Sequence, residues 1–303
     1  MRPTLRQLEY ITAVARLGRF NLAAEALNVS QPSLSAQIAE VERDLGVRLF
    51  ERNRSGVHPT GKGSEVVRRA HGILRAVEDL RASVAGEVPF GGRLRLGVLP
   101  SVGPWLLPGV VAHIHQSFPN LRVIVREEPT QDLEQGLRSG RFDRIISTPE
   151  DHPGTLQQSL FCEHLYVLLA RDDPLARGSG AVDPAELHGR IFLTLDARHR
   201  LARMVYALAS DFGGMISDEY EGTSLDSIRM MAASGAGVAI VPQLYANRQA
   251  VHDPEVAVRP LALPSANREI ALIRAGSEHS TDGDGDLLLM ELRKEARRLG
   301  LRV

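Results

Sequence analysis

Apolar positions near the start of the chain recur at helical spacing. Over residues 4–17 they return every three or four positions, which predicts an amphipathic helix. Thr4 and Gln7 have the capping-box spacing that satisfies free amides at the start of a helix. A second short helix is expected after Asn21, its predicted N-cap, and a third over Gln31–Leu45. Three short helices so close together predict a compact helical domain.

The residues after the third helix predict a hairpin and then a long helix. Residues 47–57 alternate around a polar Asn-Arg-Ser-Gly tip, which we interpret as a wing. From Thr60 onward apolar residues recur with the steps of a heptad seam. The seam consists of Val66, Ala70, Ile73, Val77, Leu80 and Val84. It predicts self-association of two such helices, and packing of the helix on its own domain is the alternative.

The Pro-Phe-Gly-Gly segment at residues 89–92 predicts a hinge. Beyond it, strand and helix patterns alternate, which predicts an α/β domain with parallel strands. The predicted strands are 94–98, 121–125, 142–146, 165–170, 192–195, 238–241 and 270–273, and the predicted helices are 106–115, 131–138, 199–212, 224–234 and 286–299. The expected fold class is therefore α/β overall, with a mainly α N-terminal domain.

The composition limits the available chemistry. With 303 residues, 43% apolar and 24% charged, the chain is long enough for several domains and is typical of a globular protein. Its single cysteine, Cys162, excludes an internal disulfide and a multi-thiolate zinc site. The stretch Asp282–Asp286 lacks the spaced ligands of a calcium loop, so no metal or cofactor is expected. We find no secretion signal and no apolar run of about 18 residues, which predicts a cytoplasmic protein without membrane contact.

The charge is unevenly distributed along the chain. Residues 1–87 hold 13 Lys and Arg against 10 Asp and Glu, a net +3. The remaining residues hold 23 against 27, a net −4. A basic front before an acidic body is compatible with nucleic-acid binding, although the difference is too small to decide it alone.

The turn at residues 28–30 separates two predicted helices, as in a helix-turn-helix. In this motif the second helix enters the major groove of DNA, and side chains near its N-terminus contact base edges. Uncharged donors and acceptors suit the bases, and arginines on the wing suit backbone phosphates. The predicted DNA-binding residues are Gln31, Pro32, Ser33, Ser35, Ala36, Gln37, Arg52 and Arg54.

Residues 1–88 resemble the DNA-binding domain and linker helix of the LysR-type transcriptional regulators. The matching stretches are LRQLEY (5–10), AAEAL (23–27), VSQPSLS (29–35), LGVRLFER (45–52) and PTG (59–61), and the resemblance continues through the rest of the chain. It implies a winged helix-turn-helix, a dimerising linker helix and a two-lobed effector domain similar to periplasmic binding proteins. The implied ranges are 1–60 for the first, 61–88 for the second and 93–303 for the third, with lobe I at about 93–163 and 267–303 and lobe II at about 164–266.

The same resemblance implies the partners. They are double-stranded DNA carrying an inverted repeat, a small-molecule effector, and further copies of the chain in a homodimer or homotetramer. RNA polymerase is allowed as another partner.

Within this family, the body of the chain resembles the OxyR-like, peroxide-sensing branch. The matching stretches are LPSVGPWLLP (99–108), TSLD (223–226) and GAGV (235–238). In that branch a reactive cysteine and a resolving cysteine form the sensor, and here Arg200 and Ala209 stand at those positions. A guanidinium cannot form a sulfenic acid or a disulfide, so the resemblance implies a regulator without this thiol switch.

If the lobes close as in the family, hydroxyls at strand ends and helix starts line the cleft beside an arginine and a histidine. The candidate effector-binding residues are Ser101, Val102, Thr130, Gln131, Ser147, Thr148, His199, Arg200 and Thr223. Such groups suit a small carboxylate or inorganic anion. The alternative is that Arg200 pairs only locally, with Asp196, and fixes one conformation.

These patterns favour a regulator over an enzyme. Ser101, His199 and Asp196 could be read as a hydrolytic set, but neither a nucleophile elbow nor metal-ligand spacing accompanies them, so no enzymatic activity is expected. We therefore expect a sequence-specific DNA-binding transcriptional regulator switched by a small, anionic effector. The alternative is an OxyR-like oxidative-stress regulator whose sensing is lost or uses another route, through Cys162 or a partner.

Overall fold

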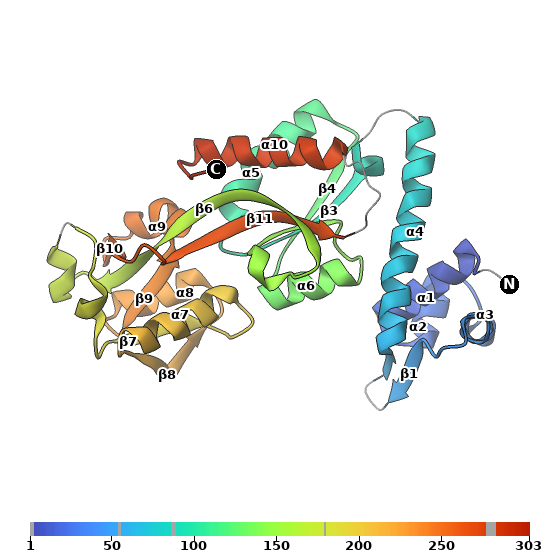
Figure 1. Ribbon diagram of the computed structural model, residues 1–303, viewed down its shortest axis with the longest axis horizontal. Coiled ribbons are helices and arrows are strands. Elements are labelled where there is room, and N and C mark those ends of the chain that lie inside the picture. Colours follow the sequence, from blue (N-terminus) through green and yellow to red (C-terminus); the bar gives the residue numbers. More distant parts are fainter. Residues whose placement is uncertain (1–2, 54–55, 86–88, 179, 277–282) are drawn as a thin grey trace. The chain divides into compact units, whose positions relative to one another are not determined.

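The computed structural model of the protein describes residues 3–53, 56–85, 89–178, 180–276 and 283–303, and the side chains of all of these except 75–76, 78–85, 91 and 283–286. The chain divides into two compact units, Met1–Gly92 with Arg138–Arg141, and Arg93–Leu137 with Phe142–Val303. We call them the first and second units (Figure 1).

The first unit is a small helical domain with a hairpin and a long helix. Its elements are α1 (Leu5–Leu17), α2 (Phe20–Ala26), α3 (Gln31–Leu45), β1 (Phe50–Asn53), β2 (Gly56–Pro59), α4 (Gly61–Ala85) and the short 3-10 turn η1 (Pro89–Gly92). The capping box of Thr4 and Gln7 is present at the start of α1. β1 and β2 pair antiparallel, with Arg52 opposite Val57, as the predicted wing requires.

Two expectations for the first unit are corrected. Asn21 does not cap α2, because that helix begins at Phe20 and its N-cap, Arg19, makes no side-chain cap bond. The other correction concerns the heptad seam, part of which packs on its own domain. Ala70 is buried in the core of the first unit and Val66 packs against that core.

The rest of the seam is less buried where the structure describes it, and Val77 is half-buried. Ile73 remains 47% exposed. The side chains of Leu80 and Val84 lie outside the described residues.

The second unit alternates strands and helices. Its strands are β3 (Arg93–Val98), β4 (Arg122–Glu127), β5 (Arg144–Ser147), β6 (Thr155–Ala170), β7 (Ile191–Leu195), β8 (Met215–Gly222), β9 (Val238–Pro242), β10 (Val256–Pro260) and β11 (Asn267–Ala275). Its α-helices are α5 (Gly103–Ser117), α6 (Thr130–Arg138), α7 (Arg200–Asp211), α8 (Leu225–Ala233), α9 (Gln243–Arg248) and α10 (Gly283–Arg298), and its 3-10 turns are η2 (Pro149–Asp151), η3 (Pro174–Arg177), η4 (Pro184–Leu187) and η5 (Ala250–His252). This mixed α/β architecture confirms the predicted fold class.

Two long strands connect two lobes of the second unit. The strand order is β4-β3-β5-β11-β6-β9-β7-β8, and β10 also pairs with β6. β3 pairs parallel with β4 and β5, and β7 pairs parallel with β8 and β9, whereas β6 and β11 run antiparallel, side by side in Figure 1. β6 pairs with β11 through His164 and with β9 from Leu165, so the passage between the lobes lies at these two residues.

Candidate DNA interface and effector cavity

The first turn of α3 presents polar side chains to solvent. Ser30 is its N-cap, with Oγ accepting a hydrogen bond from the Ser33 amide at 3.3 Å, and Pro32 occupies the first turn as predicted. Gln31, Pro32, Ser33 and Ala36 are all exposed. Because the apolar face of α3 is buried in the core, these exposed positions form the surface that can meet another molecule.

Two other predicted residues of α3 are held by neighbours. The amide group of Gln37 accepts a hydrogen bond from Gln7 at 3.1 Å and donates one to Glu40 at 3.2 Å. Ser35 Oγ lies 3.5 Å from a guanidinium nitrogen of Arg52. Gln37 is therefore committed to its own domain, and it offers base edges fewer free groups than Gln31 does.

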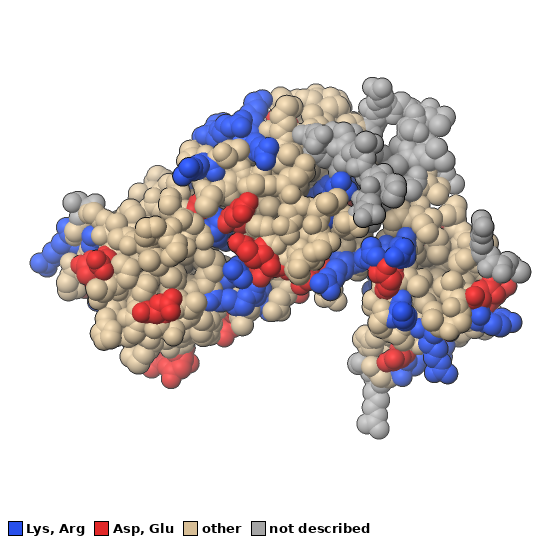
Figure 2. Space-filling view, viewed as in Figure 1, with Lys and Arg blue, Asp and Glu red and all other residues tan. Residues whose placement is uncertain are grey.

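Arg52 is positioned by the wing. Its guanidinium lies 4.6 Å from the ring centroid of Phe20, a cation–π contact that orients the charge beside α3. Arg54 lies outside the described residues. Basic side chains gather toward the lower part of the visible face of the first unit in Figure 2.

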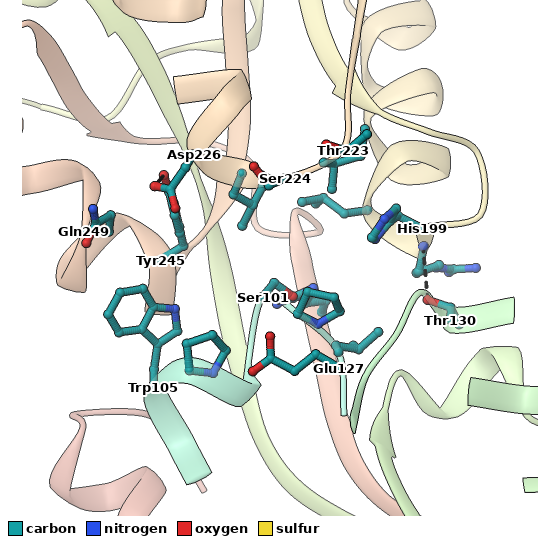
Figure 3. A pocket seen from close by; sticks show the side chains of 18 residues that line it. Ser101, Trp105, Glu127, Thr130, His199, Thr223, Ser224, Asp226, Tyr245 and Gln249 are labelled. Atoms are coloured by element: carbon teal, nitrogen blue, oxygen red, sulfur yellow. Dashed lines mark hydrogen bonds between the residues drawn. The ribbon is translucent and has the colours of Figure 1, made fainter. Parts of the chain in front are cut away.

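A cavity of about 320 Å³ lies between the two lobes of the second unit. Five of the nine predicted effector residues line it: Ser101, Thr130, His199, Arg200 and Thr223. Thirteen lining residues were not predicted, and those with aromatic, amide or charged side chains are Trp105, Glu127, Asp226, Tyr245, Gln249 and Arg268 (Figure 3). The cavity is thus more aromatic and more acidic than the sequence-based expectation.

The other four predicted residues do not line the cavity. Val102 is fully buried at the start of α5. Ser147 is also fully buried and its hydroxyl bonds the ring of His152 at 2.9 Å, while the hydroxyl of Thr148 donates to Asp151 at 2.7 Å. Gln131 is exposed on α6 outside the cavity lining. The hydroxyls of Ser147 and Thr148 are thus engaged by neighbours within the protein and do not face the cavity.

Arg200 forms a connection between the lobes. Its backbone amide donates to Thr130 Oγ1 at 3.2 Å (Figure 3), and its guanidinium lies 3.4 Å from Asp151. Arg203, one turn further along α7, binds the same carboxylate at 2.5 Å. The expected partner Asp196 is instead held by Arg198, which lowers the pKa of Asp196. We call the Asp151, Arg200 and Arg203 set the inter-lobe clamp.

His199 is buried beside the clamp, and its burial favours the neutral imidazole. Burial lowers its pKa from the ordinary value of 6.5, and this effect outweighs the attraction of Asp196 at 3.8 Å. A neutral imidazole is a poorer partner for an anion than the charged one that the sequence-based hypothesis invokes.

A buried ion pair lies where the chain passes between the lobes. Arg268 on β11 and Glu163 on β6 are 3% and 0% exposed, and their charged groups are 2.7 Å apart. Arg268 also donates to Ser101 Oγ at 2.9 Å, and the second oxygen of Glu163 accepts from the Leu244 amide at 2.9 Å. Because a buried charge is costly unless it is paired and hydrogen-bonded, this network fixes both side chains.

The geometry does not assemble a hydrolytic triad. Ser101 Oγ accepts from Arg268, and Asp196 holds Arg198. Among the residues that the structure describes, no cluster of His, Cys, Asp and Glu could hold a metal ion. Within those same residues, no helix is long and apolar enough to cross a membrane.

Cys162 has the properties of an unreactive thiol. It is exposed on β6, and partial desolvation together with Glu269 and Glu163 raises its pKa. The thiolate is the nucleophile in thiol chemistry, so a raised pKa reduces reactivity. Arg200 and Ala209 both lie on α7, where Arg200 is the first helical residue and Ala209 is buried.

Comparisons with known proteins agree with this architecture. Residues 5–64 match the family of bacterial regulatory helix-turn-helix proteins of the lysR type, and residues 89–282 match the LysR substrate binding domain. The DNA-binding transcriptional dual regulator OxyR of Escherichia coli K12 is 34% identical over 277 residues, covering 90% of each chain. A probable hydrogen peroxide-inducible genes activator of Streptomyces viridosporus is 32% identical and covers 99% of this chain and 97% of its own.

A solved structure extends the likeness to the whole chain. A full-length OxyR variant from Pseudomonas aeruginosa superposes with a TM-score of 0.76 at 29% identity, covering 96% of this chain and 98% of that one. The winged helix-turn-helix and the two-lobed second unit thus agree with the sequence comparisons. The chain belongs to the LysR family of DNA-binding transcriptional regulators.

Proposed function

We propose that this regulator is switched by a small molecule bound between the lobes of the second unit, and not by thiol chemistry. The supporting observation is the cavity of about 320 Å³, whose lining residues come from both lobes. A ligand there contacts α5 and β4 on one side and α7 and α8 on the other. It can shift the balance of lobe arrangements by its different affinity for each of them.

In this proposal α3 reads the DNA. Gln31 and Ser33 meet base edges in the major groove, and Arg52 with Arg54 binds phosphates. Two copies joined along the exposed part of the α4 seam bind an inverted repeat, with half-sites separated by whole helical turns of about 34 Å. Four copies as a dimer of dimers are the proposed assembly.

The Streptomyces viridosporus relative, named as a probable hydrogen peroxide-inducible genes activator, favours a second candidate, in which peroxide is the signal. The residues at the sensor positions count against this second candidate. At the two positions where the sequence resemblance places the sensor cysteines, the chain has an arginine clamped to Asp151 and a buried alanine. The single thiol, Cys162, has a raised pKa.

Footprinting separates the two candidates. On a duplex selected from a random pool by the wild-type protein, hydrogen peroxide should leave the footprint unchanged in wild type and in Cys162→Ser. A thermal-shift screen of small organic acids and amines should yield compounds that alter the footprint and lose their effect in Thr223→Trp, which fills the cavity. A footprint that moved with peroxide in wild type but not in Cys162→Ser would favour the second candidate instead.

A further inference from the structure

The charges around the cavity are distributed unequally between its two ends. At the end formed by α7, the arginines Arg198, Arg200 and Arg203 are matched by carboxylates, with Asp151 serving two of them and Asp196 and Asp132 serving Arg198. Arg268, the other guanidinium in the lining, is paired with Glu163. A bound anion therefore has to compete with carboxylates that already occupy every arginine of the lining.

The opposite end carries uncompensated negative charge. Asp226 accepts a hydrogen bond from Tyr245 at 2.7 Å and lies 3.6 Å from Arg229, but Arg229 is also paired with Asp253. Glu127 lines the cavity from the other lobe, on the Trp105 side, and is a further carboxylate. Asp226 and Asp253 therefore share one guanidinium and Glu127 has none, which leaves an excess of negative charge.

Glu127 is the carboxylate with no partner among the described residues that line the cavity or pack beside it. It is exposed at the end of β4, and Figure 3 shows its carboxylate inside the cavity, on the same side as Trp105. A Cβ added to Gly103 would lie 2.7 Å from its Oε1, so the carboxylate stands against the first turn of α5.

The first turn of α5 offers this carboxylate no amide. The amide of Gly103 donates to Leu99 O at 2.9 Å, the amide of Trp105 donates to Val102 O at 3.2 Å, and Pro104 has no N–H. Desolvation raises the pKa of Glu127, in keeping with a carboxylate that lacks a counter-ion.

An aromatic ring completes this end of the cavity. Trp105, two residues along from Gly103, lines the cavity from α5, with Tyr245 and Gln249 across from it on the other lobe (Figure 3). A tryptophan face is the strongest cation–π partner among the side chains, and an unpaired carboxylate is the strongest acceptor for an N–H of a cation.

We propose, building on the effector cavity of the proposed function, that the effector carries a protonated nitrogen seated at the Trp105 end, with Glu127 as its counter-ion. The class of ligand is a small organic amine or amidine whose apolar part lies against Trp105 and Leu225. This inference replaces the anionic effector expected from Arg200 and His199, because the structure engages Arg200 with Asp151.

Three probes that share a phenethyl group test the sign of the charge. Phenethylamine is a cation at neutral pH, 2-phenylethanol is neutral and 3-phenylpropanoate is an anion. By ligand-observed NMR with the full-length protein, phenethylamine should bind at least about tenfold more tightly than the alcohol, and the propanoate most weakly of the three. A stronger binding of the propanoate, equal binding of all three, or binding of none would overturn the inference.

Matched variants place the effect at Glu127. Glu127→Gln keeps the shape and removes the charge, so phenethylamine should lose its advantage over 2-phenylethanol. Glu127→Asp should retain part of it. Glu134→Gln, on α6 and outside the cavity lining, should retain all of it.

A preference that survived Glu127→Gln would overturn the assignment. The proposed function fails by a different result, namely that no compound bound in the cavity alters the DNA footprint.

Discussion

The exposed positions of α3 come from one short run of the chain, residues 31–37, whereas the cavity walls come from residues as far apart as Leu99 and Arg268. On α3, local spacing decides which side chains face out. In the cavity, the neighbours that a side chain meets depend on how distant strands pair. A local pattern can therefore identify a DNA-reading surface, but it cannot show which charges of a cavity are already used.

Breaking the long-range pair should give the largest effect. Glu163→Gln leaves Arg268 buried without its counter-ion, and we expect a loss of about 3–5 kcal/mol in the free energy of unfolding. The pair of Arg198 and Asp196 provides the contrast, because Arg198 is exposed to solvent and Arg198→Ala should cost much less.

Urea unfolding followed by circular dichroism measures the free energy of unfolding of both variants. Replacing both partners, as Glu163→Leu with Arg268→Met, should recover much of the stability, because it removes the unpaired charge. If Glu163→Gln were as stable as Arg198→Ala, the pair would have no special role.

The next effect concerns α3. Gln31→Ala should cost about 1–3 kcal/mol of discrimination at one base pair, because its side chain is exposed and free to contact a base edge. Gln37→Ala should leave base preference nearly unchanged, since Gln7 and Glu40 already hold that amide. Competition binding against a panel of single-base-pair variants of the selected duplex measures the base preference of both variants. If Gln37→Ala changed this preference and Gln31→Ala did not, the hydrogen bonds of Gln37 would have to rearrange on DNA.

The inter-lobe clamp should give a smaller change in stability. Asp151→Asn removes the carboxylate shared by Arg200 and Arg203, both about one-third exposed, and we expect a loss of about 1 kcal/mol. The same substitution leaves two guanidiniums unmatched, so the affinity for 3-phenylpropanoate should rise. Unfolding and ligand-observed NMR test the two parts, and an unchanged affinity for this anion would mean that Asp151 does not mask Arg200.

The smallest effect is a pH dependence. Because burial lowers the pKa of His199 in the folded state, the unfolded chain binds the proton first as pH falls. The contribution of His199 to stability is therefore intact above about pH 6.5 and declines below it until the folded pKa is passed. In His199→Asn, the free energy of unfolding should fall less between about pH 7 and pH 5 than in wild type. Equal declines in the two proteins would assign the pH dependence to other groups.

The sequence predicted the elements with clear periodicity and missed those without it. α3 has its predicted bounds, and the capping box at Thr4 is present. β8 and β10 were missed, as was the first half of β6, because residues 155–164 lack alternation. The partner of Arg200 was also missed, since Asp151 is 49 residues away in the chain and the lobes must fold before the two meet.

The unpredicted residues of the cavity lining teach the same lesson. Glu127 and Arg268 both end up in the lining, but nothing in their neighbours along the chain separates a paired charge from an unpaired one. That distinction comes from packing, which places Glu163 against Arg268 and leaves Glu127 beside an α5 turn whose amides are already bonded.

In the proposed switch, the passage of β6 and β11 between the lobes is the pivot. Glu163 and Arg268 sit on it, and through Ser101 and Leu244 they hold a wall of the cavity and the start of α9. A ligand in the cavity therefore contacts the protein close to the axis of the proposed lobe rotation. Displacement in a rigid body grows with distance from its axis, so the outer strands β4 and β8, at opposite ends of the strand order, have the longest lever arms. In the proposed switch, a small shift at Ser101 would therefore become a larger movement at those edges.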